Sequence, residues 1–250
     1  MPTILITGCS SGFGLDTARH FLAEDWNVIA TMRTPKADLL PVSDQLTILP
    51  LDVTDPASVT AAVAAAGDID VLVNNAGIGW LNAVEGTPLA VVRDIFETNT
   101  IGTIAMIQAV LPQFRTRRAG VIINVTSSVT LKNYELLSVY TASKAAVNAL
   151  TEVMALELAP FGIRAHVVLP GQAPGTAFST SARARIMQEG GFPEPYAGMV
   201  QAVMARVTDG ADEGKTRPED VVAAIWRVAT DPATPLRVPA GADAVALFKG

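Results

Sequence analysis

Tyr140 and Lys144 are the two side chains of this sequence whose types and spacing are best suited to proton transfer. They lie four residues apart in a stretch with helical periodicity, residues 139–159, so both should lie on one face of a helix. A neighbouring ammonium group favours tyrosinate and lowers the pKa of the phenol from its free value of ~10. Such a tyrosine can take a proton from an alcohol or give one to a carbonyl.

Ser127 is the candidate for binding the oxygen atom of a substrate. It follows a strand expected at residues 120–126 and lies thirteen positions before Tyr140. A hydroxyl at that place can hydrogen-bond the substrate oxygen and stabilise the charge that develops on it. Ser128 is the competing choice. A Tyr-x-x-x-Lys pair alone is common on helices, so this interpretation depends on the elements that position the three side chains.

Those elements are predicted to be alternating strands and helices. Strands are expected at residues 3–7, 27–32, 46–49, 69–73, 120–126, 163–169 and 236–238, and helices at residues 12–24, 55–66, 89–118 (one or two), 139–159 and from 217 onward. Strands that are apolar without alternation are buried on both faces, as parallel strands are. The 250 residues therefore predict one α/β domain, a doubly wound, Rossmann-like parallel sheet with helices on both faces.

A glycine-rich loop, T-G-C-S-S-G-F-G at residues 7–14, joins the first strand to the first helix. Gly8 suits a tight turn, Gly12 allows the backbone to approach a pyrophosphate, and Gly14 allows the helix to pack closely on the strand. The helix N-terminus offers free N–H groups to phosphates. The spacing is not the usual G-x-G-x-x-G. Cys9, within the loop, is interpreted as a small filler side chain and not as a redox group.

The composition excludes several classes of function. A net charge of −6 argues against binding to nucleic acid. The longest uncharged apolar run, residues 98–114, is too short and too polar to span a membrane, and no signal peptide is recognised. Cys9 is the only cysteine, so we expect no internal disulfide and a cytoplasmic location. His20 and His166 lie far apart, with no pattern of metal ligands around them, and no metal site is predicted.

The loop T-G-x-x-x-G-x-G resembles the cofactor loop of the short-chain dehydrogenase/reductase family, and more motifs follow in the order of that family. These are Leu51-Asp52-Val53, Asn74-Asn75-Ala76-Gly77, Asn99 with Gly102, Ser127, Tyr140-x-x-x-Lys144 and Pro170-Gly171. The resemblance covers roughly residues 3–176. It implies an oxidoreductase that transfers a hydride between a nicotinamide cofactor and a ketone or secondary alcohol.

The resemblance also implies roles for individual residues. The expected cofactor-binding residues are Gly8, Ser10, Ser11, Gly12, Phe13, Gly14, Arg33, Asp52, Val53, Asn75, Ala76, Gly77, Tyr140, Lys144, Pro170, Gly171 and Thr176. The expected catalytic residues are Asn99, Ser127, Tyr140 and Lys144. Lys144 would also hold the nicotinamide ribose, and Asn99 would anchor a water that links it to solvent. An oxidised nicotinamide would add positive charge that lowers the pKa of Tyr140 further. The family places a threonine five positions after the proline; Gly175 lies there, and Thr176 follows.

The end of the second strand predicts the choice of cofactor. A preference for NAD shows as an acidic side chain there, which binds the ribose 2′-hydroxyl. This sequence has Met32 at that position, followed by Arg33, whose guanidinium can bind a 2′-phosphate through two hydrogen bonds. We therefore expect NADP(H) to be preferred, with NAD(H) possible.

Residues 177–217 interrupt the alternation of strands and helices and predict a substrate lid within the single domain. Their apolar side chains favour a hydrophobic carbonyl or alcohol; the alternative is a helical hairpin that packs on the core. A non-catalytic, cofactor-sensing protein on the same fold is the rival function, but it would be free to lose the catalytic set. An epimerase or dehydratase would need a longer chain. The resemblance implies a homodimer or homotetramer formed through helices near residues 99–114 and 139–159.

Overall fold

The computed structural model describes residues 1–173, 184–186, 189–209 and 214–249. Within them the chain forms a seven-stranded parallel sheet with the order β3-β2-β1-β4-β5-β6-β7. The strands are β1 (Thr3–Ile6), β2 (Asn27–Met32), β3 (Leu46–Pro50), β4 (Val71–Asn74), β5 (Gly120–Val125), β6 (Ile163–Pro170) and β7 (Arg237–Ala240). The predicted doubly wound parallel sheet is confirmed.

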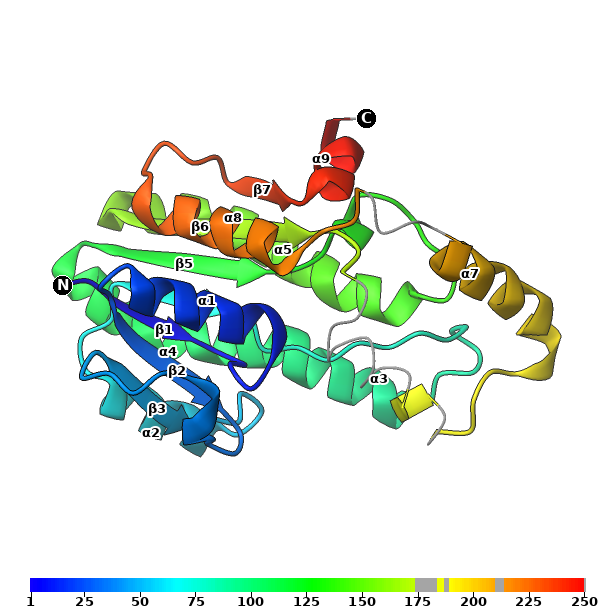
Figure 1. Ribbon diagram of the computed structural model, residues 1–250, viewed down its shortest axis with the longest axis horizontal. Helices are drawn as coiled ribbons and strands as arrows, with labels where there is room; N and C mark the ends of the chain where they lie inside the picture. The colour runs from blue at the N-terminus through cyan, green and yellow to red at the C-terminus, as the bar shows by residue number, and fades with distance from the viewer. Residues whose placement is uncertain (174–183, 187–188, 210–213, 250) are drawn as a thin grey trace.

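Helices cover both faces of this sheet (Figure 1). They are α1 (Gly12–Ala23), α2 (Pro56–Ala66), α3 (Leu89–Phe96), α4 (Gly102–Arg117), α5 (Ser138–Leu158), α7 (Ala197–Asp209), α8 (Pro218–Thr230) and α9 (Ala242–Lys249). Along β1, Ile4 and Ile6 join the core under α1 and α8, whereas Leu5 joins the core under α2, α4 and α5. Both faces of the strand are therefore buried, which explains its uninterrupted apolar sequence.

The strand order reverses next to β1, which pairs with β2 on one side and with β4 on the other. The chain leaves β1 toward α1, and it leaves β4 toward a loop that begins at Asn75. A crevice opens between such diverging connections at the carboxyl edge of the sheet, where ligands of doubly wound folds bind. All strands end at this edge because all pair in parallel, on the right-hand side of Figure 1.

Local sequence signals explain where several helices begin. Asp55 caps α2 by accepting a hydrogen bond from the Ala57 N–H (2.9 Å), and Pro56 occupies the first helical position. Pro218 begins α8 in the same way, and the Asp220 carboxylate accepts from the Arg217 N–H (2.9 Å). These two starts were predicted from the sequence within one residue.

The stretch 89–118, expected to hold one or two helices, forms α3 and α4 with a short π-helix, Glu97–Ile101, between them. Two other features differ from the sequence-based expectations. The strand expected at 69–73 begins at Val71. Helix α9 was not predicted at all. Of the predicted lid, residues 177–183, 187–188 and 210–213 lie outside the described residues.

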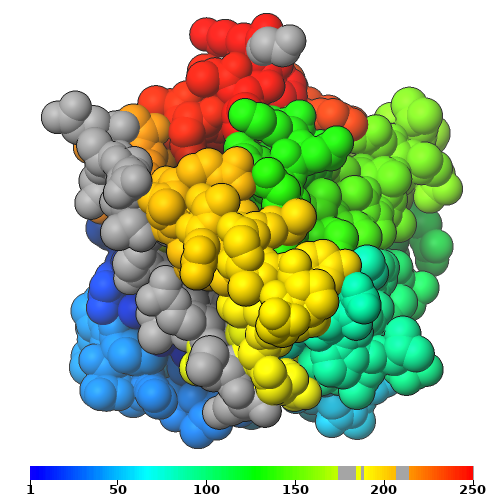
Figure 2. Space-filling model, turned by 90° about the vertical axis from the view of Figure 1, so that its right-hand side faces the viewer, coloured from blue at the N-terminus to red at the C-terminus, as the bar shows by residue number. Residues whose placement is uncertain are grey.

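The described part of the predicted lid lies beyond the carboxyl edge of the sheet. Ile186 is buried among Trp80, Val91 and Ile95, and Phe192 packs against the same cluster. Between residues 197 and 206, α7 has no buried side chain. Figure 2 shows these residues in yellow and orange across the face to which the strands point. The segment therefore lies where a lid would lie, and that role stays a prediction.

Candidate active site

The glycine-rich loop connects β1 to α1 at the carboxyl edge. A side chain on Gly14 would overlap the carbonyl oxygen of Gly8, so α1 packs closely on the loop that follows β1. None of the described residues lies within 4 Å of the side-chain position of Gly12, so among them this stretch of backbone is open to a ligand. Ser11 precedes α1 without a side-chain cap, so the first-turn N–H groups are available to an anion.

A cavity of about 980 Å³ begins at this loop and extends along the carboxyl edge of the sheet. Predicted cofactor residues that line it are Gly8, Ser10, Ser11, Gly12, Phe13, Arg33, Asp52, Val53, Asn75, Ala76, Gly77, Tyr140, Lys144, Pro170 and Gly171. Gly14 lies behind the loop, and Thr176 lies outside the described residues. The volume is at the upper end of the ~300–1,000 Å³ usual for ligand pockets.

The cofactor loop and the loop after β4 are joined by hydrogen bonds. The Asn75 side chain donates to the carbonyl oxygens of Thr7 (2.9 Å) and Gly8 (3.2 Å). In return, the Thr7 hydroxyl accepts from the N–H groups of Asn75 (3.0 Å) and Ala76 (2.9 Å). Two walls of the cavity are therefore held at a fixed separation by side chains that belong to predicted motifs.

Ser127, Tyr140 and Lys144 come together on one wall of the cavity. Ser127 lies two residues after β5, whereas Tyr140 and Lys144 occupy one face of α5. Ser127 and Tyr140 share a side-chain hydrogen bond. Lys144 Nζ donates to the carbonyl oxygen of Val125 (3.1 Å). Among the described residues Ser127 lines the cavity and Ser128 does not, which favours Ser127 of the two candidates.

Burial dominates the ionisation of this pair. It lowers the pKa of Lys144 from 10.5 to about 8. It also raises the pKa of Tyr140 well above its ordinary value, and the hydrogen bond with Ser127 opposes this only in part. The direction for Tyr140 is opposite to the sequence-based expectation, because desolvation of the buried phenol outweighs the hydrogen bond with Ser127.

Asn99 lies in the π-helix and forms hydrogen bonds with two elements that carry residues of the site. Its side chain accepts from the Ile78 N–H (2.8 Å) and donates to the Ile78 carbonyl (3.0 Å) and to Ser143 Oγ (3.1 Å). Ser143 in turn donates to the Tyr140 carbonyl (2.7 Å). Asn99 therefore joins the loop after β4 to the N-terminal part of α5. Short π-helical insertions often mark functional sites, and this one turns a buried polar side chain toward both elements.

Arg33 and Asp52 lie together at the other end of the cavity. Asp52 accepts hydrogen bonds from the hydroxyl (2.7 Å) and the N–H (2.9 Å) of Thr54, and these lower its pKa more than the charge of Arg33 does. Arg33 is exposed, whereas the preceding Met32 is buried. The guanidinium is thus free to reach a group at the cavity mouth, although a carboxylate competes for it.

Several cavity residues were missed by the sequence analysis. They are Thr54, Ile78, Gly79, Asp94, Glu97, Thr98, Val125, Thr126, Val129, Leu137, Gln172, Ala173 and Arg185. Seven of these thirteen lie in loops, where no periodicity marks them. Asp94 of α3 forms an ion pair with Arg185 at 2.6 Å, so the predicted lid segment carries a charged contact at the cavity as well as apolar side chains.

Other sequence-based expectations concern groups away from this chemistry. Cys9 is completely buried, and burial raises its pKa to about 12, which makes it an unreactive thiol and supports the filler interpretation. In the part of the chain that the structure describes, no cluster of three or more His, Cys, Asp or Glu side chains is suited to a metal ion. None of the described helices is both long and apolar enough to cross a bilayer.

Comparison with known proteins identifies the family. The model of the short chain dehydrogenase family matches residues 2–186. An uncharacterised oxidoreductase of Bacillus subtilis, YusZ, is 37% identical over 90% of this chain and 84% of its own. The bacterial 3-ketodihydrosphingosine reductase of Bacteroides thetaiotaomicron is 33% identical, covering 98% and 90% of the two chains. Bovine retinol dehydrogenase 8 is 38% identical over 68% of this chain and 58% of its own.

Solved structures agree with this assignment. A short-chain dehydrogenase from Streptomyces avermitilis is 32% identical, with a TM-score of 0.84 over 100% of this chain and 92% of its own. A serine dehydrogenase complexed with NADP⁺ is 28% identical, with a TM-score of 0.78 over 96% of this chain and 94% of its own. A 3-ketoacyl-(acyl-carrier-protein) reductase from Brucella melitensis complexed with NADH is 25% identical, with a TM-score of 0.76 over 95% and 96% of the two chains. Fold and cavity define a dinucleotide-dependent oxidoreductase. The chain belongs to the short-chain dehydrogenase/reductase family and is an NAD(P)-dependent enzyme.

Proposed function

We propose that this enzyme transfers a hydride between NADP(H) and a hydrophobic ketone or secondary alcohol. The observation that carries the proposal is the hydrogen-bonded pair of Ser127 and Tyr140, with Lys144 one helical turn away, on the wall of a cavity that begins at the N-terminus of α1. Proton transfer and phosphate binding are thus available in one continuous cavity.

The residues that line the cavity fit a nicotinamide dinucleotide. The uncapped first turn of α1 and the open backbone at Gly12 suit the pyrophosphate, Asp52 and Val53 suit the adenine, and Lys144 suits the nicotinamide ribose. The cofactor supplies the hydride. With the adenosine end near Asp52, the nicotinamide end lies toward Tyr140, as the redox chemistry requires.

In carbonyl reduction, Tyr140 donates its phenolic proton to the substrate oxygen as the hydride reaches the carbon. The Ser127 hydroxyl donates a hydrogen bond to the same oxygen and stabilises its developing charge. The raised pKa of Tyr140 keeps the phenol protonated in the protein alone, which suits a proton donor. Lys144, with a pKa of about 8, can return a proton to the phenolate near neutral pH. Oxidation of an alcohol reverses these transfers.

The substrate end of the cavity supports a hydrophobic substrate. Ile78, Val129 and Leu137 line it close to the catalytic side chains. The relatives named for retinol and 3-ketodihydrosphingosine support the same class of substrate. The Asp94–Arg185 ion pair satisfies its own charges and therefore offers less to an anionic substrate than a lone arginine would.

The preference for NADP(H) is supported by Arg33 at the cavity mouth and by the absence of an acid at Met32. A cytoplasmic location and a homodimer or homotetramer remain further predictions. Val153 and Leu156 of α5 and Ile101 beside α4 are exposed apolar side chains, which supports assembly through these helices. Light scattering with size-exclusion chromatography measures the oligomeric state directly.

The function is tested with a panel of apolar ketones and secondary alcohols. Turnover of each compound is measured by the change in nicotinamide absorbance, with NADP(H) and with NAD(H). We expect turnover of at least one apolar compound, and its loss in Tyr140→Phe. Activity confined to polyanionic substrates would contradict the substrate class. Tight cofactor binding without turnover of any compound would favour the cofactor-sensing alternative.

A further inference from the structure

Asp243 and Thr216 lie far along the chain from the catalytic residues but contact the backbone that follows β6. Asp243 Oδ2 accepts from the Gln172 N–H at 2.7 Å. The Thr216 hydroxyl accepts from the Gly171 N–H at 2.9 Å, and its own oxygen lies 2.6 Å from Asp243 Oδ1. Gly171 and Gln172 both line the cavity, so these two side chains hold a piece of its wall from outside.

The contact is closely packed. Thr216 is 3% exposed, and a side chain on Gly171 would overlap the Asp243 carboxylate. The Thr216 N–H also donates to the Gln172 carbonyl (3.1 Å), and the Asp243 N–H donates to the Gly214 carbonyl (3.1 Å). Asp243, in the first turn of α9, therefore joins residues 171–172, which precede the predicted lid, to Gly214 and Thr216 at its C-terminal end.

We propose that Asp243, together with Thr216, is a positioning residue for the nicotinamide end of the cofactor. This rests on the proposed function, because it assumes that the nicotinamide lies near Tyr140. Gly171 and Gln172 belong to the same cavity as Tyr140 and lie at the end of β6, away from Arg33 and Asp52. A carboxylate that accepts a backbone N–H makes a charge-assisted hydrogen bond, which fixes this backbone more firmly than a neutral contact would.

The position of Asp243 and Thr216 predicts that their loss weakens the binding of one end of the dinucleotide only. Loss of the carboxylate should loosen residues 171–172 and weaken binding of the nicotinamide, but it should leave the pyrophosphate and adenosine contacts unaffected, since those come from the loop before α1 and from the end of β3. A purely structural role would lower stability without distinguishing the two ends of the dinucleotide.

Binding measurements on Asp243→Ala, Thr216→Val and Thr216→Ser test this proposal. The ligands are NADPH and 2′-phospho-ADP-ribose, which lacks the nicotinamide, or NADH and ADP-ribose if the enzyme prefers NAD. Asp243→Ala and Thr216→Val should weaken dinucleotide binding about tenfold, as expected for one lost charge-assisted hydrogen bond, and leave the fragment unaffected. Thr216→Ser keeps the hydroxyl and should bind like the parent.

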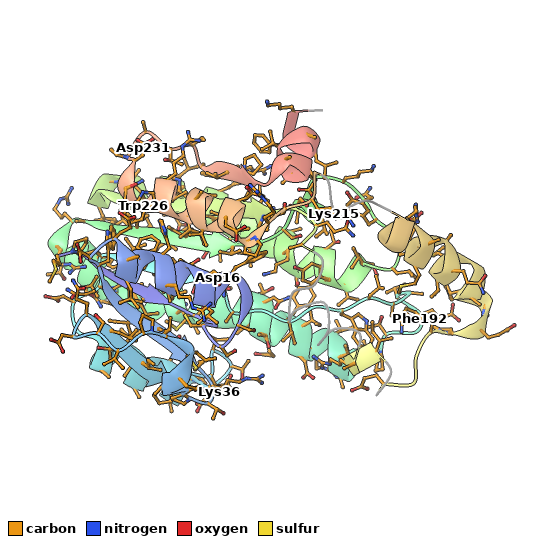
Figure 3. The ribbon with its side chains drawn as sticks, in the orientation of Figure 1. Asp16, Lys36, Phe192, Lys215, Trp226 and Asp231 are labelled. Atoms are coloured by element: carbon orange, nitrogen blue, oxygen red, sulfur yellow. The ribbon has the colours of Figure 1, made fainter. Side chains whose placement is uncertain are left out.

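Asp231→Ala is the matched control. The Asp231 carboxylate also accepts a backbone N–H, that of Ala233 (2.9 Å), but it lies at the opposite end of the sheet from Lys215, the neighbour of Thr216 (Figure 3). Amide exchange of residues 171–172 in the protein without cofactor gives a second readout. It should become faster in Asp243→Ala and stay unchanged in Asp231→Ala.

The outcomes separate the two proposals. Unchanged amide exchange, or an equal loss of affinity for dinucleotide and fragment, would overturn the role of Asp243. A parent protein that binds neither dinucleotide would overturn the proposed function and with it the nicotinamide-side role. If Asp243→Ala does not fold, the two Thr216 variants decide the question, because Thr216→Val replaces the hydroxyl with a methyl group whereas Thr216→Ser keeps the hydroxyl.

Discussion

Lys144 Nζ lies 3.1 Å from the carbonyl oxygen of Val125, so the lysine of α5 is joined to the last residue of β5. The buried amine therefore lies next to Val125, which is two residues before Ser127 in the chain, and it lies one helical turn after Tyr140. Burial lowers its pKa from 10.5 to about 8, because the Val125 carbonyl replaces only part of the hydration that an ammonium group has in water.

The shifted pKa of Lys144 predicts a dependence of stability on pH. Between pH 8 and 10.5 the unfolded chain holds a proton that the folded chain has lost, so the free energy of unfolding should rise with pH in this window. The free energy of unfolding should be measured by denaturant for the parent and for Lys144→Met. From pH 8 to pH 10.5, the value of the parent should rise relative to that of the variant by up to about 3 kcal/mol. A difference that does not vary with pH would contradict the buried, shifted amine.

Tyr140→Phe should leave folding and cofactor binding nearly intact, because it removes one hydroxyl. Turnover should fall by at least ~10²-fold, the usual effect of losing a general acid–base group. Tyr134→Phe is the matched control: Tyr134 is 40% exposed and is not among the residues lining the cavity, so turnover should stay at the parent level. Steady-state rates with the best substrate of the panel decide between these outcomes, and parent-like turnover of Tyr140→Phe would remove the proton-donor role.

Asn99 is expected to contribute strongly to stability as well as to the site. Asn99→Leu leaves the Ile78 N–H and carbonyl without their partners at a position that is 1% exposed, which should lower the free energy of unfolding by about 3 kcal/mol. Thr100→Val removes the neighbouring hydroxyl, which makes one hydrogen bond, to the Ser143 carbonyl, and should cost about 1 kcal/mol. Similar losses in the two variants, measured by denaturant unfolding, would argue against Asn99 as the link between these elements.

The sheet and most of the cavity could be predicted because their signals are local. Uninterrupted apolar strands specify a parallel sheet, and the residues at the strand ends, such as Gly8, Asn75 and Ser127, meet at one edge for that reason alone. The cofactor loop was recognised because the spacing of Gly8, Gly12 and Gly14 is a local feature of the sequence and depends on no long-range contact.

Long-range contacts explain what could not be predicted. Asp243 reaches Gln172 across 71 residues of sequence, and Arg185 reaches Asp94 across 91, with no periodicity to mark either pair. The direction of the pKa shift of Tyr140 was wrong for a related reason. The sequence shows the neighbouring charge, but the burial that raises the pKa of Tyr140 comes from tertiary packing, which no local pattern marks.

Arg33→Ala should abolish most of the preference for NADPH over NADH. A charge-assisted contact with the 2′-phosphate is worth about 1.5–3 kcal/mol, or roughly ten- to a hundredfold in affinity, and NADH does not make it. The competing charge of Asp52 favours the lower end of this range. Because Arg33 is exposed, the preference of the parent should also decline as salt is added.

Lys36→Ala is the matched control for this prediction. Lys36 is an exposed cation three residues after Arg33 (Figure 3), and it is not among the residues that line the cavity. Titration of each variant with both cofactors should show weaker NADPH binding in Arg33→Ala, unchanged NADH binding, and parent-like values for Lys36→Ala. If the parent binds NADH as tightly as NADPH, or if Lys36→Ala loses as much NADPH affinity as Arg33→Ala, Arg33 does not select the cofactor, although the proton transfer at Tyr140 is unaffected by that result.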